Sequence, residues 1–405
     1  MILKNCRLIP ALCEGFEEER ADLRIEGKKI AEILPANGTY TGEEVIDLEG
    51  KTVIPGMYNL HEHLYWEKNS FPTLHAYSLS DHLLRSINFA GCLMSYGYTT
   101  IRDCGSINNM AMTLRDAVKA GVVAGPNILA CGPSFSPHFP DEKLLDIYSS
   151  CDCYGHPIRD ISDIKGEVRR QLAEGADFIK VCGSTRKEEV KCDQDALGRF
   201  LWYPEEIMEF SKAAQKEGSY VAAHSTCVES DEAIIEAECY TLEHGYYLNQ
   251  DNVDRIVKHG FKTNYVPTVA ATYVGWKQQW STYETVHSGA IEALRLTHDA
   301  GVLIGWGTDD FQKDFKKLPA VEFIARADSG ISNVDLLKQA TINSAKILKQ
   351  DKKKGTVKAG KVADLCIING NPDEDLTVLN APCSYVLKNG KVVARDGIVM
   401  TTEVK

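Results

Sequence analysis

The sequence predicts an α/β protein in which a (β/α)8 TIM-type barrel carries a small β-sandwich domain formed by both termini. Strand-like and helical segments alternate through the middle of the chain, and both ends are rich in short strands. Histidine, lysine and aspartate side chains follow several of the central strands. Alternating strands and helices are typical of a parallel sheet surrounded by helices, which favours a barrel for the centre.

The two ends of the chain have the same β-rich texture. Alternating or apolar runs separated by glycines and tight turns predict strands at 1–3, 21–25, 30–34, 44–48, 363–368, 385–388 and 391–394. Asn389-Gly390, between the last two runs, is a strong hairpin signal. Neither end is long enough for a convincing core alone, so we expect one β-sandwich domain from residues 1–54 and 352–405.

Between these ends the chain repeats a strand–helix pattern. Eight strand-like runs end near His61, Asp103, Cys131, Lys180, His224, His244, Pro267 and Asp309. Helical stretches separate them, for example at 111–120, 204–217, 253–258 and 290–300. Eight such units are the number in a (β/α)8 barrel, which we expect over residues 55–351.

The composition of the 405 residues excludes several classes of protein. A formal net charge of −12 argues against a nucleic-acid partner, because phosphate binding needs a basic surface. Apolar runs stay far below the ~20 residues of a membrane span, so we expect no membrane association. The thirteen cysteines are scattered and the start of the chain lacks the apolar core of a signal peptide. These features predict reduced thiols in a cytoplasmic protein, and a homo-oligomer is compatible with them.

His61-Glu62-His63 follows the apolar run that begins at Val53. In a strand, residues i and i+2 point to the same face, so the two imidazoles would project together. Two neutral imidazoles aimed at one point suit Zn²⁺ or a similar metal. A pair of ordinary polar residues at a strand end explains the isolated motif equally well.

Six side chains at predicted strand ends strengthen the metal interpretation. Singly, each has a structural explanation: a buried core histidine, a helix cap or a lysine that reaches solvent along its strand. Together they meet on one rim, because the carboxyl ends of barrel strands form the active-site face. The predicted metal-site residues are His61, His63, Lys180, His224, His244 and Asp309.

With these residues in place, the chain resembles the amidohydrolase superfamily of metal-dependent hydrolases. The matching features are Pro55-Gly56 before His61-x-His63, Lys180 on the fourth strand, the fifth- and sixth-strand histidines, and Gly307-Thr308-Asp309 on the eighth. Phe178-Ile179-Lys180-Val181 and Leu242-Glu243-His244-Gly245 resemble the imidazolonepropionase-related or prolidase-like branch. That branch contains Xaa-Pro and Xaa-Arg/Lys dipeptidases, carboxypeptidases and N-acyl amino acid hydrolases.

The resemblance implies two divalent metal ions, with zinc favoured and manganese, iron or cobalt also compatible. His61, His63 and Asp309 would hold the buried metal, and His224 and His244 the more exposed one. Lys180 would bridge them as a CO2-derived carbamate, because an ammonium cannot ligate a cation. A hydroxide bridging the metals would attack the substrate, with Asp309 taking its proton and passing it to the leaving amine.

The implied reaction is cleavage of a C–N amide bond, with a dipeptide or an N-acyl amino acid as the favoured small-molecule substrate. Hydrolytic ring opening of a cyclic amide, as in imidazolonepropionase-like or hydantoinase-like chemistry, is the alternative. Deamination is less favoured, because Cys227 stands where aromatic-base deaminases often carry a glutamate. A non-catalytic scaffold ranks below both, because all six ligand positions are filled.

The sequence departs from this branch around the expected substrate contacts. Thr226 occupies the place of a tyrosine that polarises the substrate carbonyl in many relatives. Either another donor, such as Tyr65 or Tyr246, takes its place, or the substrate differs from a dipeptide. Arg186 could bind a substrate carboxylate, although a solvated loop is the more favoured explanation. His138 follows the third strand and is a further candidate contact.

Overall fold

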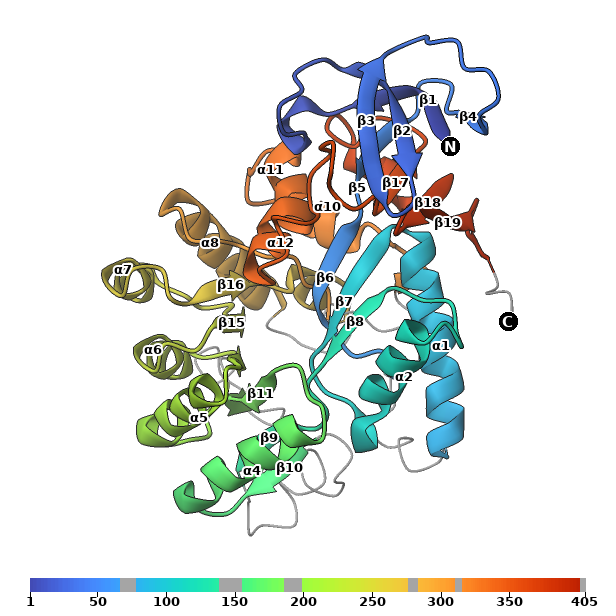
Figure 1. Cartoon of the computed structure of the whole chain (residues 1–405). Helices are drawn as coiled ribbons and strands as arrows, with labels where there is room; N and C mark the ends of the chain where they lie inside the picture. The colour runs from blue at the N-terminus through green and yellow to red at the C-terminus, as the bar shows by residue number, and fades with distance from the viewer. Residues whose placement is uncertain (66–77, 138–154, 186–198, 276–282, 310–314, 401–405) are drawn as a thin grey trace.

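The structure of the chain is a computed structural model, and it describes residues 1–65, 78–137, 155–185, 199–275, 283–309 and 315–400. In these ranges the two chain ends lie together at one end of the molecule, beside a set of parallel strands flanked by helices (Figure 1). No helix in this part of the chain is long and apolar enough to cross a lipid bilayer.

Strands from both termini form one nine-stranded sheet, in the order β20-β19-β18-β17-β5-β1-β2-β3 with β4 paired to β1. Pairing is antiparallel except between β1 and its neighbours β4 and β5. The sheet therefore contains strands from both ends of the chain, whereas the two-layer sandwich domain stays a prediction. Its strands are β1 (Ile2–Leu8), β2 (Arg20–Glu26), β3 (Lys29–Pro35), β4 (Val45–Asp47), β5 (Thr52–Pro55), β17 (Leu365–Ile368), β18 (Tyr385–Lys388), β19 (Lys391–Arg395) and β20 (Ile398–Val399).

The central strands pair in parallel, in a three-stranded sheet and a six-stranded one. The first has the order β6-β7-β8 and the second the order β10-β9-β11-β14-β15-β16. Their bounds are β6 (Met57–Glu62), β7 (Tyr98–Asp103), β8 (Asn127–Ala130), β9 (Ser134–Pro137), β10 (Gly155–Ile158), β11 (Ile179–Cys182), β14 (Val221–Ser225), β15 (Thr241–His244) and β16 (Asn264–Val266). An antiparallel pair, β12 (Ser184–Thr185) and β13 (Arg199–Phe200), follows β11.

The predicted eighth strand runs between the outer strands of these two sheets. Ile304 forms an isolated parallel bridge with Tyr265 of β16, and the amide of Leu60 on β6 donates to the carbonyl of Trp306 at 2.6 Å. The 302–309 segment thus lies between β16 and β6 and makes several backbone hydrogen bonds on each side, with Tyr265 of β16 and with Leu60 and His61 of β6. It brings Asp309 beside His61, whose carbonyl accepts the Asp309 amide at 2.9 Å.

The pair Gly132-Pro133 separates β8, the third predicted strand, from a further strand, β9. Gly132 adopts φ +77°, a conformation that favours glycine, and Pro133 has no amide hydrogen to continue a ladder. The chain resumes as β9, where Phe135 pairs with Val181 of β11. The predicted end at Cys131 is therefore correct for β8, but the prediction missed β9 and β10.

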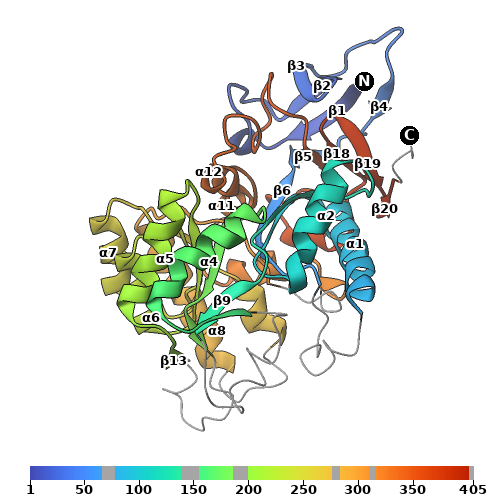
Figure 2. The ribbon, with the colours of Figure 1, turned by 60° about the horizontal axis from the view of Figure 1, so that its bottom comes forward.

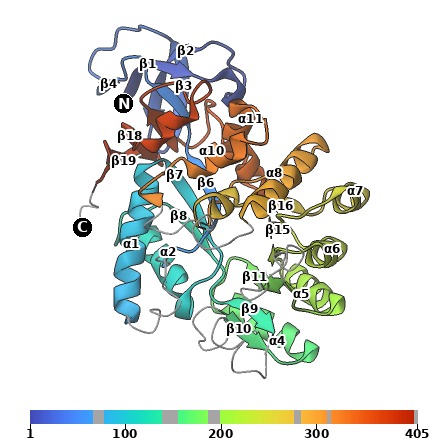
Figure 3. The same ribbon diagram turned by 180° about the vertical axis from the view of Figure 1, so that it is seen from behind.

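Helices flank the parallel strands on their outer side (Figures 2 and 3). The predicted helical stretches correspond to α2, α5, α7 and α8. The helices are α1 (Leu79–Ser95), α2 (Met110–Lys119), α4 (Ile161–Ala173), α5 (Pro204–Lys216), α6 (Val228–Glu236), α7 (Gln250–Lys258), α8 (Tyr283–Asp299), α10 (Val321–Ala327), α11 (Asn333–Lys338) and α12 (Ser344–Ile347), with the π-helical turns η5 (Ala271–Gly275) and η6 (Gln339–Asn343). Local signals mark their starts: Ser78 and Asp81 form a capping box on α1, and α5 begins with Pro204.

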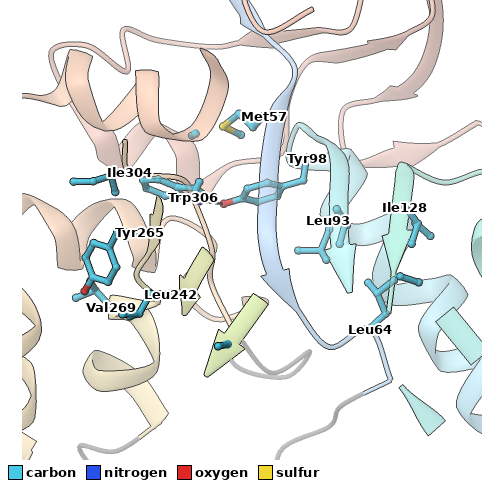
Figure 4. Packing of buried hydrophobic residues seen from close by; sticks show 14 of the residues in the cluster. Met57, Leu64, Leu93, Tyr98, Ile128, Leu242, Tyr265, Val269, Ile304 and Trp306 are labelled. Atoms are coloured by element: carbon cyan, nitrogen blue, oxygen red, sulfur yellow. Dashed lines mark hydrogen bonds between the residues drawn. The ribbon is translucent and has the colours of Figure 1, made fainter. Parts of the chain in front are cut away.

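Large apolar side chains fill the space between these strands and helices. Trp306 is fully buried, and its indole nitrogen donates to the hydroxyl of Tyr98 at 3.3 Å (Figure 4). Leu93 of α1 and Ile128 of β8 belong to the same cluster. Burial of this kind supplies most of the driving force for folding and holds the strand ends in fixed positions.

Asp231, in the first turn of α6, is a buried carboxyl that offers a test of this packing. Burial raises its pKa from the ordinary 3.8 to about 8, and the Ser225 hydroxyl opposes the shift only in part. Because the folded-state pKa is the higher one, the folded protein holds this proton more tightly than the unfolded chain does. The resulting stability is complete below about pH 4 and is lost as the pH rises to about 8.

An Asp231→Asn variant should therefore gain stability relative to the parent protein as the pH rises. Asparagine has nearly the same shape and does not titrate, so the gain should grow by at most about 1.4 kcal/mol per pH unit between pH 4 and 8 and then level off. Urea unfolding at several pH values measures it. A difference that stays constant across this range would show that the carboxyl keeps an ordinary pKa.

Candidate metal centre

His61 and His63 lie at the carboxyl end of β6, and both are buried. The Nδ1 atom of His61 is 2.7 Å from Oε2 of Glu243 on β15. The Nδ1 atom of His63 lies 2.9 Å from the backbone carbonyl of Gly105, after β7. An acceptor at Nδ1 fixes the hydrogen there, which leaves each Nε2 lone pair available for a metal ion.

His224 and His244 stand at the ends of the adjacent strands β14 and β15. Their ring centroids are 4.4 Å apart, and the ring of His61 lies 4.5 Å from that of His244. His244 has φ +67°, which is uncommon for a non-glycine residue and turns the chain sharply at the strand end. Three imidazoles from three strands thus face one another.

Asp309 reaches the same place from the predicted eighth strand. Its Oδ1 lies 3.7 Å from Nε2 of His63 and 4.0 Å from Nε2 of His61, and its Oδ2 lies 4.0 Å from Nδ1 of His244. Gly307 allows this approach, because a Cβ there would lie 2.7 Å from the Cβ of His61. Asp309 itself has φ +49°, so the backbone turns where the carboxylate enters the site.

Lys180 projects from β11 into this group of side chains and is buried. Its Nζ is 3.3 Å from Nε2 of His61. Burial, followed by the charge of Lys180, lowers the pKa of His63 to about 3 and that of His61 well below its ordinary value. Both imidazoles are therefore neutral at physiological pH, which is the form that binds metals.

The donor atoms fit a divalent cation. Ligand atoms of His61, His244 and Asp309 all lie within 4.8 Å of one another, and all three residues are buried. Imidazole nitrogens combined with a carboxylate oxygen suit Zn²⁺ and the other divalent first-row metals. The geometry therefore brings together all six of the predicted ligand residues, five of them buried and His224 partly exposed.

The sequence analysis missed the groups that hold these ligands. Glu243 and the carbonyl of Gly105 accept from His61 and His63, and Oγ1 of Thr268 is 2.7 Å from Nδ1 of His244. Asp103 accepts the amide of Leu64, next to His63, at 2.9 Å. A charged residue inside an apolar strand-like run, such as Glu243, is the one signal that could have drawn attention beforehand.

The predicted substrate contacts have mixed outcomes. Tyr65 is buried with its ring centroid 6.4 Å from that of His63, so it borders the site. Tyr246 is buried and its hydroxyl lies 2.9 Å from Oγ1 of Thr268, which places it behind His244. The amide of Thr226 donates to Oγ of Ser184 at 2.8 Å, and the two hydroxyls are 2.9 Å apart. His138 and Arg186 fall outside the described residues.

Comparisons with known proteins agree with this geometry. The sequence profile of the Amidohydrolase family matches residues 52–393. Ochratoxinase of Aspergillus niger is 26% identical over 381 residues, covering 85% of this chain and 76% of the relative. Imidazolonepropionase of Thermoplasma volcanium is 24% identical over 413 residues, covering 96% and 92%.

Solved structures give the same result. A Xaa-Pro dipeptidase with bound methionine in its active site superposes with a TM-score of 0.82 at 26% identity, covering 96% of this chain and 98% of that one. Relatives that include imidazolonepropionase and this dipeptidase confirm the branch indicated by the sequence. A profile match that spans most of the chain shows its family: the protein belongs to the amidohydrolase family.

Proposed function

We propose that this protein is a binuclear metal-dependent amidohydrolase that cleaves a C–N amide bond of a dipeptide or an N-acyl amino acid. One observation carries the proposal: donor atoms of His61, His244 and Asp309, from three separate segments, lie within 4.8 Å of one another in a buried site. The similarity to a Xaa-Pro dipeptidase supports the choice of a dipeptide.

The six residues would divide between two metal ions. His61, His63 and Asp309 would hold one ion, and His224 and His244 the other. Such a pair of cations polarises the scissile carbonyl and lowers the pKa of bound water. Lys180, with its Nζ 3.3 Å from His61, would repel a cation as an ammonium, so we propose that it carries a CO2-derived carbamate.

Asp309 would move the proton in this reaction. Its two oxygens lie 3.7–4.0 Å from nitrogens of His61, His63 and His244, close enough to face a water held among them. A carboxylate in that place accepts the proton of the attacking water and returns it to the leaving amine. Tyr65, at the border of the site, is the proposed hydrogen-bond donor to the substrate carbonyl.

Hydrolytic ring opening of a cyclic amide is the second candidate. Thr226, which pairs with Ser184, stands where dipeptide-cleaving relatives place a tyrosine, and imidazolonepropionase is among the similar proteins. The two candidates differ in their products, because ring opening yields one molecule whereas cleavage of a linear amide releases a free amine. A scaffold without catalysis is less well supported, since every ligand position is filled.

The domain architecture and the cellular location are part of the same proposal. We propose a closed (β/α)8 barrel over residues 55–351 and a β-sandwich domain from 1–54 and 352–405. The backbone hydrogen bonds on both sides of the 302–309 segment support closure. We also propose that the protein is cytoplasmic. Its partner would be a small-molecule or dipeptide substrate, and not nucleic acid or a membrane.

Metal analysis tests the proposal directly. Purified protein reconstituted with zinc and bicarbonate should contain about two metal ions per chain. Lys180→Ala should lower that number, and short carboxylates such as propionate should restore part of it by replacing the carbamate. Lys354→Ala is the matched control, because Lys354 is also largely buried but pairs with Asp364 away from the histidines.

A panel of dipeptides, N-acyl amino acids and cyclic amides then identifies the reaction. Release of a free amine supports the linear substrates, and turnover to a single product favours ring opening. One metal ion that is insensitive to Lys180 would overturn the bridged site. A protein that binds no metal after reconstitution would overturn the hydrolase proposal altogether.

A further inference from the structure

A buried arginine lies among the strands close to the predicted metal ligands. Arg102 of β7 is fully buried. Its Nη2 is 2.5 Å from Oε1 of Glu243, its Nη1 donates to Oγ1 of Thr241 at 3.1 Å, and its Nε donates to the carbonyl of Leu60 at 2.5 Å. The guanidinium therefore connects β7 to β6 and to β15.

Glu243 contacts both Arg102 and the predicted metal ligand His61. Its Oε1 accepts from Arg102 and from the hydroxyl of Thr241, while Oε2 lies 2.7 Å from Nδ1 of His61. Because both oxygens are engaged, the carboxylate cannot turn without breaking several hydrogen bonds. The ring of His61 is held with Nε2 toward Lys180, at 3.3 Å, and toward Asp309, at 4.0 Å.

The acceptor at His61 differs in kind from those at the other predicted ligands. His63 has a backbone carbonyl at Nδ1 and His244 has a threonine hydroxyl, whereas His61 has an ionisable carboxylate. A carboxylate acceptor draws the Nδ1 hydrogen more strongly and raises the basicity of the opposite nitrogen. His61 should therefore be the strongest nitrogen donor of these three.

A purely structural role for Arg102 is the competing explanation. Its bonds to Leu60 and Thr241 would tie strands together whether or not a metal is present. However, a buried ion pair is costly to desolvate, and apolar residues of similar volume often stabilise a core equally well. The Arg102–Glu243 ion pair also contacts the predicted ligand His61, and this contact holds the imidazole in one tautomer and one orientation.

We infer that Arg102 and Glu243 are positioning residues that set the affinity of the His61–His63–Asp309 metal site. This inference rests on the proposed binuclear function and adds residues that act through His61 rather than on the substrate. The affinity of this site would then depend on the Arg102–Glu243 pair through His61, whereas the hydroxyl of Thr268 lies at Nδ1 of His244 in the other site.

Glu243→Gln is the most informative variant, because an amide has only one acceptor oxygen and cannot present an acceptor to both Arg102 and His61. With its oxygen held by Arg102, its NH2 group faces Nδ1 of His61 and forces the hydrogen onto Nε2, the metal-binding nitrogen. Metal affinity at this site should fall about 10- to 100-fold, the usual effect of losing such an outer partner. Arg102→Lys keeps a cation beside Glu243 and should lower the metal affinity of this site by a smaller factor. It tests the inference independently if Glu243→Gln does not fold.

Two controls separate positioning from stability. Arg7→Lys alters another largely buried arginine, which makes a two-pronged contact with Asp373 at 2.8 Å in the terminal sheet. It should lower the unfolding temperature of the metal-free protein and leave metal affinity unchanged. Thr268→Val removes the partner of His244 and should weaken the other metal site instead.

Metal-free protein is titrated with Co²⁺ or Zn²⁺ against a chromophoric chelator, and thermal unfolding is followed in parallel. The expected result is two binding steps in the parent protein, with only one of them weakened in Glu243→Gln. Two unchanged steps in a less stable variant would overturn the inference and leave the proposed function intact. A parent protein that binds no metal would overturn both.

Discussion

An Asp309→Asn variant should fold normally and lose about 10²- to 10⁴-fold in kcat toward the amide substrate, the range typical of a lost general acid–base group. Asparagine fills the same volume but cannot accept a proton from water. The carboxylate lies 3.7 Å from His63 and 4.0 Å from His61 and His244, so it faces all three rings. Steady-state kinetics at saturating zinc, with metal content measured on the same samples, gives the result.

Asp328→Asn is the matched control for this substitution. Asp328 also pairs with a histidine, His287 at 3.2 Å, but it is exposed at the end of α10. Its activity should match that of the parent protein. If Asp309→Asn retains its metal and more than a tenth of the parent kcat, a group other than Asp309 moves the proton.

Much of the site could be predicted because its residues occupy equivalent positions on parallel strands. Five of the predicted ligands stand at, near or just beyond the carboxyl ends of their strands, and parallel strands bring such ends to one edge. Lys180 is the second residue of β11 and reaches the same group from within its strand. His224 and His244 follow adjacent strands, β14 and β15, with Ser225 opposite His244 in the register. The periodicity of each strand was enough to find them, with no knowledge of distant contacts.

The supporting groups could not be predicted in this way, because they depend on contacts across the fold. Arg102 and Glu243 are 141 residues apart in sequence, and His61 and Glu243 are 182 apart. No local pattern connects them. Strand periodicity predicts on which side of the sheet a side chain lies, but it does not predict the distant residue that the side chain contacts. Likewise, the pairing of Thr226 with Ser184 depends on β12, which the sequence analysis did not expect.

The fold, like the site, was predictable where local patterns determine it and unpredictable where tertiary contacts do. Apolar runs with breaks of glycine or turn residues located the strands of both ends and of the centre. The split between β8 and β9 was missed because a Gly-Pro pair ends one ladder but also permits another to begin. Which strand resumes pairing depends on its neighbour β11, and therefore on the tertiary arrangement.

Arg326→Met should destabilise the protein by about 3–5 kcal/mol, the usual cost of breaking a buried ion pair from one side. Arg326 of α10 is fully buried with Nε 2.5 Å from Oε1 of Glu322, and its guanidinium lies 4.2 Å from the centre of the Trp306 ring. It also donates to the carbonyls of Gly305 and Pro267, within the predicted eighth strand and at the end of the predicted seventh. The substitution therefore removes bonds from the segments that lead to Asp309.

The loss should grow as the pH rises. Burial raises the pKa of Glu322, and Arg326 partly opposes that shift. Without the guanidinium the folded-state pKa rises further above its ordinary 4.5, so the folded protein retains the proton more tightly and loses stability at higher pH. Urea unfolding of the metal-free variant at pH 5 and pH 8 should show the larger deficit at pH 8.

Arg295→Met provides the comparison on the surface. Arg295 pairs with Glu292 at 2.7 Å within α8, and both side chains are about half exposed. Water solvates each partner once the other is gone, so the unfolding midpoint should barely change. Adding Glu322→Leu to Arg326→Met should recover part of the lost stability, because it removes the buried carboxylate left without its cation. No recovery in the double variant would show that the carbonyl bonds of Arg326, and not its ion pair, hold these segments.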